Sequence, residues 1–370
     1  MSTIRILVVD DSVVIRKLLS DTLSEDRALD VVGTASDGRI ALAKIAQLKP
    51  DLITLDIEMP VMNGLETLAA LRKLYPKLPV IMFSTLTNRG AAATLDALSL
   101  GASDYATKPN TGSPADSMER IRAELIPKIK ALCGVAVPLK LVALPHVRPA
   151  VKVRARTNPC IEIVAIGTST GGPNALAEVL PRIPNDFPVP IVVVQHMPPI
   201  FTRLLAERLA SHSAIPVEEG SAGVVLSPGR VWIAPGNFHM KVARAGVKWR
   251  LELTQAPPEN SCRPAVDVLF RSVAAACGAH VLGVVMTGMG SDGVLGAQDI
   301  CDAGGNVIIQ DEASSVVWGM PGLVHASGLD DAAYPLDQLA TAITKRVLHS
   351  RGAQIQVDQK RSAAAAAPAK

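Results

Sequence analysis

Two alternating series of aliphatic runs and amphipathic stretches constrain the fold more than any other feature of the chain. Runs of the first series occupy residues 4–9, 31–35, 52–55, 80–83 and 104–107. Runs of the second series occupy residues 161–166, 191–194, 281–286 and 307–310. Stretches with helical spacing follow the runs, and this alternation is typical of parallel sheets with helices on both faces. Because only 3% of the residues are aromatic, we expect aliphatic cores, as in buried parallel strands.

The break between the two series predicts the domain organisation. Residues 134–159 contain four prolines and no acidic residue, which predicts an interdomain linker because proline removes backbone donors and interrupts helices. We therefore expect one α/β domain at residues 1–133 and a second at residues 160–350. The alanine-rich tail at residues 351–370 is predicted to be disordered.

One region of the second domain departs from the alternation. Residues 229–254 contain short strand-like pieces at 231–233 and 248–253, separated by turns. These pieces predict a β-hairpin excursion from a doubly wound α/β domain.

Composition weighs against several classes of protein. The formal net charge is only +3, and no dense block of Lys and Arg occurs, so nucleic-acid binding is not expected. No apolar run approaches the roughly 20 residues of a membrane helix, and the N-terminus has no pattern of a secretory signal. Five scattered cysteines without a Cys-x-x-Cys pair predict reduced thiols in a cytoplasmic protein.

Acidic residues follow the ends of predicted strands in the first domain. Asp10 and Asp11 come directly after the first strand, and Asp56 follows the third. Ligands of open α/β sheets bind beyond these carboxyl ends, where the strand order switches. Three carboxylates that meet there repel one another unless a cation is present. The sequence therefore predicts a Mg²⁺ site, since Mg²⁺ prefers a few carboxylates and retains waters.

A hydroxyl and an ammonium group are predicted at the same edge of the sheet. Ser84 ends the fourth strand, and Lys108 follows the fifth, so both could hold an anion bound to Asp56. The alternative is that all of these are ordinary polar loop residues. A single residue would favour that alternative, whereas five at matching strand ends favour a site.

These residues resemble the response-regulator receiver family. The resemblance is carried by residues 10–11, 55–60, 63–64, 84 and 108–109. It implies a flavodoxin-like domain with a five-stranded parallel sheet, in which Asp56 accepts a phosphoryl group from a phosphohistidine kinase. Attack by a carboxylate next to a metal ion is chemically reasonable for this step. The other implied roles are Mg²⁺ binding by Asp10, Asp11, Asp56 and the backbone of Glu58, phosphoryl contacts from Ser84 and Lys108, and a switch aromatic at Tyr105.

A glycine-rich turn follows the first strand of the second domain. Residues 167–171 read Gly-Thr-Ser-Thr-Gly and lead into a helix that begins near Pro173. One interpretation is an anion-binding cradle at a helix start, although neither Gly-x-Gly-x-x-Gly nor the Gly-Lys-Ser/Thr ending of a P-loop is present. The other is a nucleophile turn around Ser169, because the turn fits Gly-x-Ser-x-Gly. Both interpretations place positive potential beside Ser169.

A serine nucleophile needs a base and an orienting carboxylate. His196 is the best-placed histidine, because it follows a strand predicted to lie beside that of Ser169. Asp292 lies in a glycine-rich turn after a third strand. The chain order Ser, His, Asp differs from that of the α/β-hydrolases, but triads are recognised by geometry. A purely architectural turn and a non-catalytic histidine stay open as alternatives, and position alone does not exclude His239, His280 or His325.

Longer motifs of the second domain resemble the chemotaxis methylesterase family, CheB. They lie in order at residues 166–172, 195–198, 262–270, 286–293, 310–314 and 319–321. The resemblance implies a protein-glutamate methylesterase and protein-glutamine glutaminase. Its substrates would be methyl-glutamyl and glutaminyl side chains on the cytoplasmic helices of methyl-accepting chemoreceptors. Its phosphodonor would be the chemotaxis histidine kinase CheA.

The resemblance also implies roles for individual residues. Ser169 would attack the side-chain acyl carbon, His196 would take its proton, and Asp292 would hold the imidazole tautomer. Backbone donors near Thr170 and Met289 would stabilise the oxyanion. Mg²⁺ is expected in the receiver domain, and no cofactor is expected for hydrolysis.

Two other functions compete with this interpretation. A DNA-binding output domain would need a basic recognition helix and a domain much smaller than about 190 residues. An inactive, hydrolase-like binding module is opposed only by the complete set of Ser169, His196 and Asp292.

Overall fold

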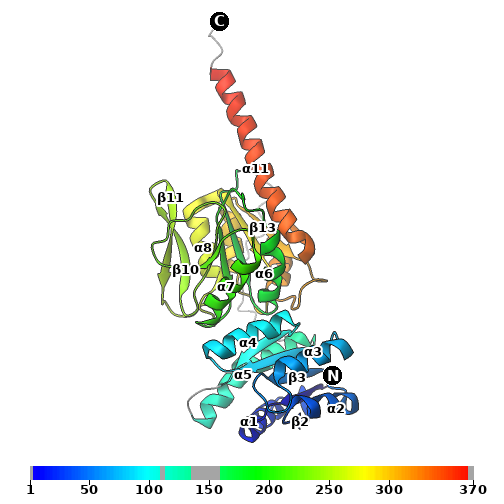
Figure 1. Cartoon of the computed structure of the whole chain (residues 1–370). Coiled ribbons are helices and arrows are strands. Elements are labelled where there is room, and N and C mark those ends of the chain that lie inside the picture. The colour runs from blue at the N-terminus through cyan, green and yellow to red at the C-terminus, as the bar shows by residue number, and fades with distance from the viewer. Residues whose placement is uncertain (1–2, 109–112, 135–158, 366–370) are drawn as a thin grey trace. The chain divides into compact units, whose positions relative to one another are not determined.

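The computed structural model describes residues 3–108, 113–134 and 159–365 (Figure 1). It divides the chain into two compact units, residues 1–140 and 141–370. Each unit has a hydrophobic core of its own. Apart from its two end residues, the predicted linker at 134–159 lies outside the described residues.

The first unit is a five-stranded parallel sheet with helices packed against it. Its strand order is β2-β1-β3-β4-β5. The strands are β1 Ile4–Val9, β2 Leu29–Ala35, β3 Leu52–Asp56, β4 Val80–Ser84 and β5 Asp104–Thr107. The helices are α1 Val13–Ser24, α2 Gly38–Leu48, α3 Gly64–Leu74, α4 Asn88–Ser99 and α5 Pro114–Leu132. The predicted flavodoxin-like fold is confirmed.

The strand order places the polar residues of the first unit at one edge. The chain winds away from β1 in one direction to β2 and in the other to β3, so the switch point lies beyond the carboxyl ends of β1 and β3. Asp10 follows β1, and Asp56 is the last residue of β3. Ser84 is the last residue of β4, and Lys108 follows β5.

The second unit is built on a seven-stranded parallel sheet with the order β14-β13-β12-β6-β7-β9-β8. Its strands are β6 Ile163–Thr168, β7 Ile191–Gln195, β8 Val217–Glu219, β9 Val231–Ile233, β12 Val281–Val285, β13 Asn306–Gln310 and β14 Ala332–Tyr334. Its α-helices are α6 Gly172–Val179, α7 Phe201–His212, α8 Val266–Cys277, α9 Val294–Asp302, α10 Met320–Ala326 and α11 Leu336–Ala365.

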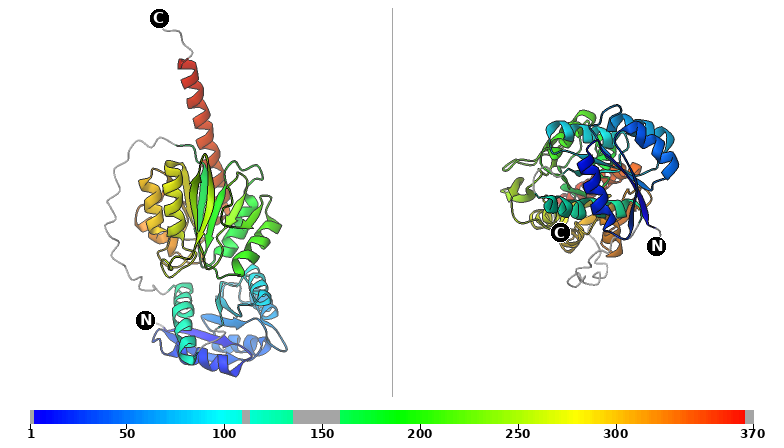
Figure 2. Two further views of the ribbon diagram at one scale, coloured as in Figure 1. Left: turned by 90° about the vertical axis from the view of Figure 1, so that its left-hand side faces the viewer. Right: turned by 90° about the horizontal axis from the view of Figure 1, so that it is seen from below.

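Helices cover both faces of this sheet, as a doubly wound domain requires. Helices α8 and α9 lie on one face, and α6 and α7 on the other (Figure 2). The antiparallel hairpin of β10 His239–Ala245 and β11 Lys248–Thr254 packs on α8, where Val242 N–H donates to Ser272 Oγ at 3.0 Å. The predicted doubly wound fold with a hairpin excursion is confirmed.

Some details differ from the sequence prediction. Residues 231–233, which we grouped with the hairpin, form β9 in the main sheet, because they are buried and pair with both β7 and β8. Strands β8, β10 and β14 and helices α10 and α11 were not predicted. For β8, β14 and α10 the reason is that elements this short carry little periodicity. The tail expected to be disordered from residue 351 continues α11 to Ala365, as its alanines favour.

No helix in the described ranges is both long and apolar enough to cross a bilayer. The five cysteines are free thiols.

Candidate active site

Ser169 lies directly after β6, at the start of a tight turn into α6. Its N–H donates to the Thr287 carbonyl at 3.0 Å, and its own carbonyl accepts from Gly172 N–H at 2.8 Å and from Gln195 Nε2 at 2.9 Å. Gly171 has φ 78°, a left-handed conformation that strains residues with a Cβ. These bonds fix the serine backbone to residues at the ends of β7 and β12, while Ser169 itself stays partly exposed.

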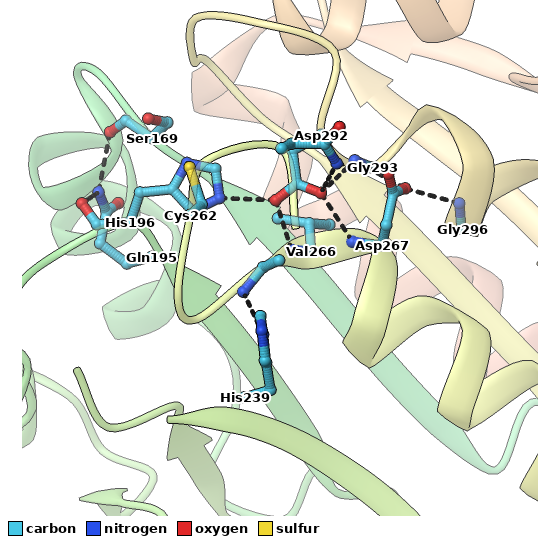
Figure 3. Close-up of polar contacts among 12 residues, drawn as sticks. Ser169, Gln195, His196, His239, Cys262, Val266, Asp267, Asp292, Gly293 and Gly296 are labelled. Atoms are coloured by element: carbon cyan, nitrogen blue, oxygen red, sulfur yellow. Dashed lines mark hydrogen bonds and ion pairs between the residues drawn. The ribbon is translucent and has the colours of Figure 1, made fainter. Parts of the chain in front are cut away.

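His196 follows β7, the strand that pairs with β6. Its side chain is 12% exposed, and its Nε2 lies 2.7 Å from Asp292 Oδ2 (Figure 3). Its Nδ1 lies 3.5 Å from Cys262 Sγ. Among the described residues, no hydrogen bond joins the imidazole to Ser169 Oγ. Since Asp292 occupies Nε2, Nδ1 is the nitrogen that can exchange a proton with other groups.

Asp292 is a buried carboxylate surrounded by donors from the start of α8. Val266 N–H donates to Oδ2 at 2.6 Å, and Asp267 N–H donates to Oδ1 at 2.9 Å. The carboxylate thus takes the place of a helix cap, since the N-cap residue Ala265 offers no side-chain acceptor. Burial opposes its ionisation, but the hydrogen bond and charge of His196 and these backbone donors lower the pKa of Asp292.

A second buried carboxylate, Asp267, lies beside Asp292. Its Oδ1 accepts hydrogen bonds from Gly293 N–H at 2.9 Å and Gly296 N–H at 2.7 Å, at the start of α9. Asn260 Nδ2 donates to both carboxylates, at 2.8 Å to Asp267 and 2.9 Å to Asp292. Burial, and then repulsion from Asp292, raise the pKa of Asp267 to about 7. Asp292 therefore caps α8, the helix that carries Asp267. In turn, Asp267 caps α9, the helix that follows Asp292 in the chain.

The pKa of His196 follows from the same surroundings. Burial opposes the imidazolium form, but the interactions of the imidazole with Cys262 and with the Asp292 carboxylate raise the pKa of His196 above its ordinary value. The site thus stabilises the imidazolium that forms when His196 takes a proton.

The two residues expected to support an oxyanion lie near the serine. Thr170 follows Ser169 and is buried, with its carbonyl accepting from Thr287 Oγ1 at 2.9 Å. Met289 follows Gly288, where an added Cβ would lie 2.9 Å from Ser169 Cβ. The turn of Gly288 and Met289 therefore approaches the turn of Ser169 closely.

The histidines that position alone did not exclude have other partners. His239 Nε2 lies 3.0 Å from the Pro257 carbonyl, and its Nδ1 accepts from Ala265 N–H at 3.2 Å. His280 Nδ1 lies 2.8 Å from the Cys160 carbonyl, and His325 Nδ1 lies 3.2 Å from Asp330 Oδ1. Among these histidines, His196 is the one beside the glycine-rich turns.

The first unit gathers its acidic residues at the predicted edge. Three carboxylate oxygens, one each from Asp10, Asp11 and Asp56, all lie within 4.8 Å of one another. Lys108 Nζ lies 2.8 Å from Asp10 Oδ2 and 2.8 Å from Asp56 Oδ2. Burial raises the pKa of Asp56 to about 6, although Lys108 opposes this shift. Three convergent carboxylate oxygens fit a hard divalent cation such as Mg²⁺.

The other predicted residues of the first unit border this cluster. A pocket of about 240 Å³ is lined by Asp56, Glu58, Ser84 and Lys108, among others. Ser84 Oγ donates to the Gly90 carbonyl at 3.1 Å, and Glu58 Oε1 lies 3.3 Å from Arg89 Nε. Tyr105 does not line the pocket; its buried ring lies 4.9 Å from Lys128 Nζ.

Comparison with known proteins identifies the family of each domain. Residues 164–343 match the family model described as CheB methylesterase, and residues 6–121 match the response regulator receiver domain. A protein-glutamate methylesterase/protein-glutamine glutaminase of Trichodesmium erythraeum is 54% identical over 94% of this chain and 100% of its own length. The chain belongs to the CheB methylesterase family. A relative of the same description from a Nocardioides species is 53% identical over 95% of this chain and 97% of its own length.

A solved structure is also similar to part of this chain. The crystal structure of the Thermotoga maritima CheB methylesterase catalytic domain is 41% identical, with a TM-score of 0.49, and covers 50% of this chain and 98% of that domain. As a CheB-family member, the chain is a hydrolase of the methylesterase type that also contains a response-regulator receiver domain.

Sequence reasoning did not assign three residues of this CheB-family site. Asp267 and Cys262 lie within the motif at 262–270, but no role was derived for either. Asn260 precedes that motif. An acidic residue in the first turn of the predicted helix was the available signal for Asp267. Nothing local marks Asn260 or Cys262, because their partners come from distant parts of the chain.

Proposed function

We propose that this protein is a protein-glutamate methylesterase and protein-glutamine glutaminase of chemotaxis adaptation, and that phosphorylation activates it. Its substrates would be side chains on the cytoplasmic helices of methyl-accepting chemoreceptors. One observation carries the proposal. Ser169, His196 and Asp292 follow the adjacent strands β6, β7 and β12, and 2.7 Å separate His196 Nε2 from Asp292 Oδ2. The names of the relatives support the same activity.

In the proposed reaction, Asp292 keeps the Nε2–H tautomer of His196, so the lone pair of Nδ1 takes the proton of Ser169. The Ser169 oxygen attacks the acyl carbon of the methyl-glutamyl side chain. Backbone N–H groups near Thr170 and Met289 would stabilise the oxyanion, each with an effect of about 10²–10³ in rate. His196 gives the proton to the departing methoxide oxygen, or to the departing nitrogen of a glutaminyl side chain, so that methanol or ammonia leaves. Water then loses a proton to His196, attacks the acyl-enzyme and releases the glutamate, and His196 returns the proton to the Ser169 oxygen.

In the receiver domain, Asp56 would accept the phosphoryl group from the histidine kinase CheA. Asp10, Asp11, Asp56 and the backbone carbonyl of Glu58 would hold Mg²⁺, which neutralises the charge that develops during transfer. Ser84 and Lys108 would contact the phosphoryl oxygens, and Tyr105 would serve as the switch aromatic. Hydrolysis at Ser169 is proposed to need no cofactor.

For regulation, we propose a receiver domain at residues 1–133 that inhibits the catalytic domain at 160–350 through a linker at 134–159. Residues 351–370 would form a tail outside the catalytic domain. Phosphorylation adds nearly two negative charges beside Lys108, which is enough to reposition neighbouring loops. Interfaces within one chain are modest, so a few kcal/mol can change their population strongly. The protein is proposed to act in the cytoplasm, without binding nucleic acid or inserting into a membrane.

The direct test is methanol release from methyl-labelled chemoreceptors, with and without a phosphodonor. We expect release by the intact protein and a higher rate after phosphorylation, with folded Ser169→Ala as the inactive control. Equal methanol release by Ser169→Ala would overturn the proposed mechanism. Cleavage between residues 134 and 158 should free a catalytic fragment faster than the unphosphorylated chain, and a fragment that is no faster would rule out inhibition by the receiver domain.

A further inference from the structure

Cys262 forms a thiol–imidazole–carboxylate series with two residues of the active site. Its Sγ lies 3.5 Å from His196 Nδ1, and the opposite nitrogen of the same ring lies 2.7 Å from Asp292 (Figure 3). Cys262 as a residue is partly exposed. This arrangement is the one in which an imidazole takes the proton of a nucleophilic cysteine.

The turn that carries Cys262 is held firmly in place. Glu259 and Cys262 exchange backbone hydrogen bonds of 3.1 and 2.9 Å, around Asn260 and Ser261 with φ 53° and 62°. The side chain of Asn260 binds both buried carboxylates. On the other side of Cys262, Arg263 donates to Asn237 Oδ1 at 2.6 Å. The thiol is therefore positioned by its neighbours on both sides.

The other cysteines lie in different surroundings. Burial raises the pKa of Cys277 to about 12 and that of Cys133 to about 11, which keeps both as thiols. Cys160 and Cys301 donate to the backbone carbonyls of Ile161 and Leu329. A contact between a cysteine sulfur and an imidazole nitrogen is found at Cys262, whereas Cys160 meets His280 through its backbone carbonyl.

We propose that Cys262 is a modification site for hydroperoxides and other soft electrophiles, and that its modification inactivates the hydrolase. The reason is that Nδ1 of His196 has a single lone pair. Ser169 needs this lone pair to lose its proton, and Cys262 Sγ already lies 3.5 Å from it. A group added to Sγ occupies the space beside Nδ1 and separates the base from Ser169. This consequence for hydrolysis rests on the proposed function, whereas the reactivity of the thiol does not.

A hydroperoxide would oxidise Cys262 with His196 as the proton carrier. His196 Nδ1 takes the thiol proton while Sγ attacks one peroxide oxygen, so that an S–O bond forms and the O–O bond breaks. The leaving oxygen takes the proton back from His196 and departs as water or an alcohol. Sulfur is oxidised to a sulfenic acid, and the peroxide is reduced.

The first experiment measures thiol reactivity on the full chain with iodoacetamide, which forms an S–C bond and releases iodide and a proton. Peptide mass spectrometry should show Cys262 labelled about tenfold faster than Cys160. The His196→Ala variant should slow labelling of Cys262 about tenfold and leave Cys160 unchanged. Equal rates at the two cysteines, or no effect of His196→Ala, would overturn the proposal.

The second experiment measures the consequence for Ser169 with a fluorophosphonate probe, which bonds the serine oxygen to phosphorus as fluoride leaves. Treatment with hydrogen peroxide should abolish Ser169 labelling in the wild type and in the matched Cys160→Ala variant. The Cys262→Ala variant should keep the labelling rate that it has before treatment. Equal loss in all three proteins would overturn the proposal. If untreated Ser169 does not react at all, the proposed function fails, while the iodoacetamide rates still decide whether His196 activates Cys262.

Discussion

Asp56 and Asp292 are both buried carboxylates at the carboxyl edge of a parallel sheet, yet their surroundings suit opposite tasks. Asp292 accepts hydrogen bonds from backbone amides at the start of α8, from Asn260 and from His196, and its pKa is lowered. Asp56 lies beside Lys108 and accepts one backbone hydrogen bond, and its pKa is raised to about 6.

The difference shows how donors decide what a buried carboxylate can do. A carboxylate whose lone pairs are occupied stays charged and stationary, which suits a residue that orients an imidazole. A carboxylate with few donors keeps its oxygens for a metal ion and a phosphoryl group.

The largest expected change is a loss of hydrolysis that leaves phosphorylation intact. Ser169→Ala and His196→Ala should each reduce methanol release by roughly 10⁶-fold, and the double variant should be little worse, because the two residues act as one unit. Phosphorylation of Asp56, followed with a labelled phosphodonor, should not change. Loss of that labelling would show that the two sites are not separable.

Substituting Asp292 and Asp56 by asparagine, one at a time, compares the two carboxylates directly. Asp292→Asn should reduce hydrolysis by about 10⁴-fold, since the wrong imidazole tautomer is then favoured. Asp56→Asn should leave the basal rate intact and abolish the response to phosphodonor. Both variants need circular dichroism as a control for folding. A basal rate that collapses in Asp56→Asn would contradict the division of tasks.

Chelation sharpens the same contrast without a mutation. EDTA should prevent labelling of Asp56 and the increase of methanol release by phosphodonor, because the carboxylates of Asp10, Asp11 and Asp56 are left without their cation. The basal rate of the full chain should stay the same, and added Mg²⁺ should restore the response. A basal rate that falls with EDTA would indicate a metal in the hydrolysis itself.

The smallest expected effect is a shift in the pH dependence of hydrolysis. His196 acts as a base only when it is neutral, so the rate rises as the pH passes through its pKa. Burial lowers that pKa, whereas the interactions of the imidazole with Cys262 and Asp292 raise it, so Cys262→Ala should move the rising limb to lower pH, by about one pH unit. Rates measured from pH 5 to 10 test this, with Cys160→Ala as the control. A limb that stays in place would show that the thiol does not affect the base.

Much of this molecule could be predicted from the sequence, because parallel strands alternate with helices and polar residues follow the strand ends. That rule led to Asp10, Asp56, Ser84 and Lys108 in the first domain. It led likewise to Ser169, His196 and Asp292 in the second. The bounds of β6, β7, β12 and β13 differ from the expected ones by at most two residues.

What escaped prediction depends on contacts between distant segments. Asn260 lies in a tight turn and looks like any turn residue, yet its amide bridges two carboxylates that are 7 and 32 positions further along the chain. Strand β8 has three residues and owes its place to pairing with β9. Such features arise only once the domain has folded.

The exchange of caps between α8 and α9 has a consequence for how this enzyme can evolve. Active-site charges usually reduce stability, so that removing them yields a firmer but inactive protein. Here Asp292 binds the first amides of α8, and Asp267 binds those of α9. Substituting Asp292 would therefore weaken the domain as well as the chemistry, since it leaves buried donors unsatisfied. Selection for a stable fold would then favour this carboxylate independently of its proposed catalytic role.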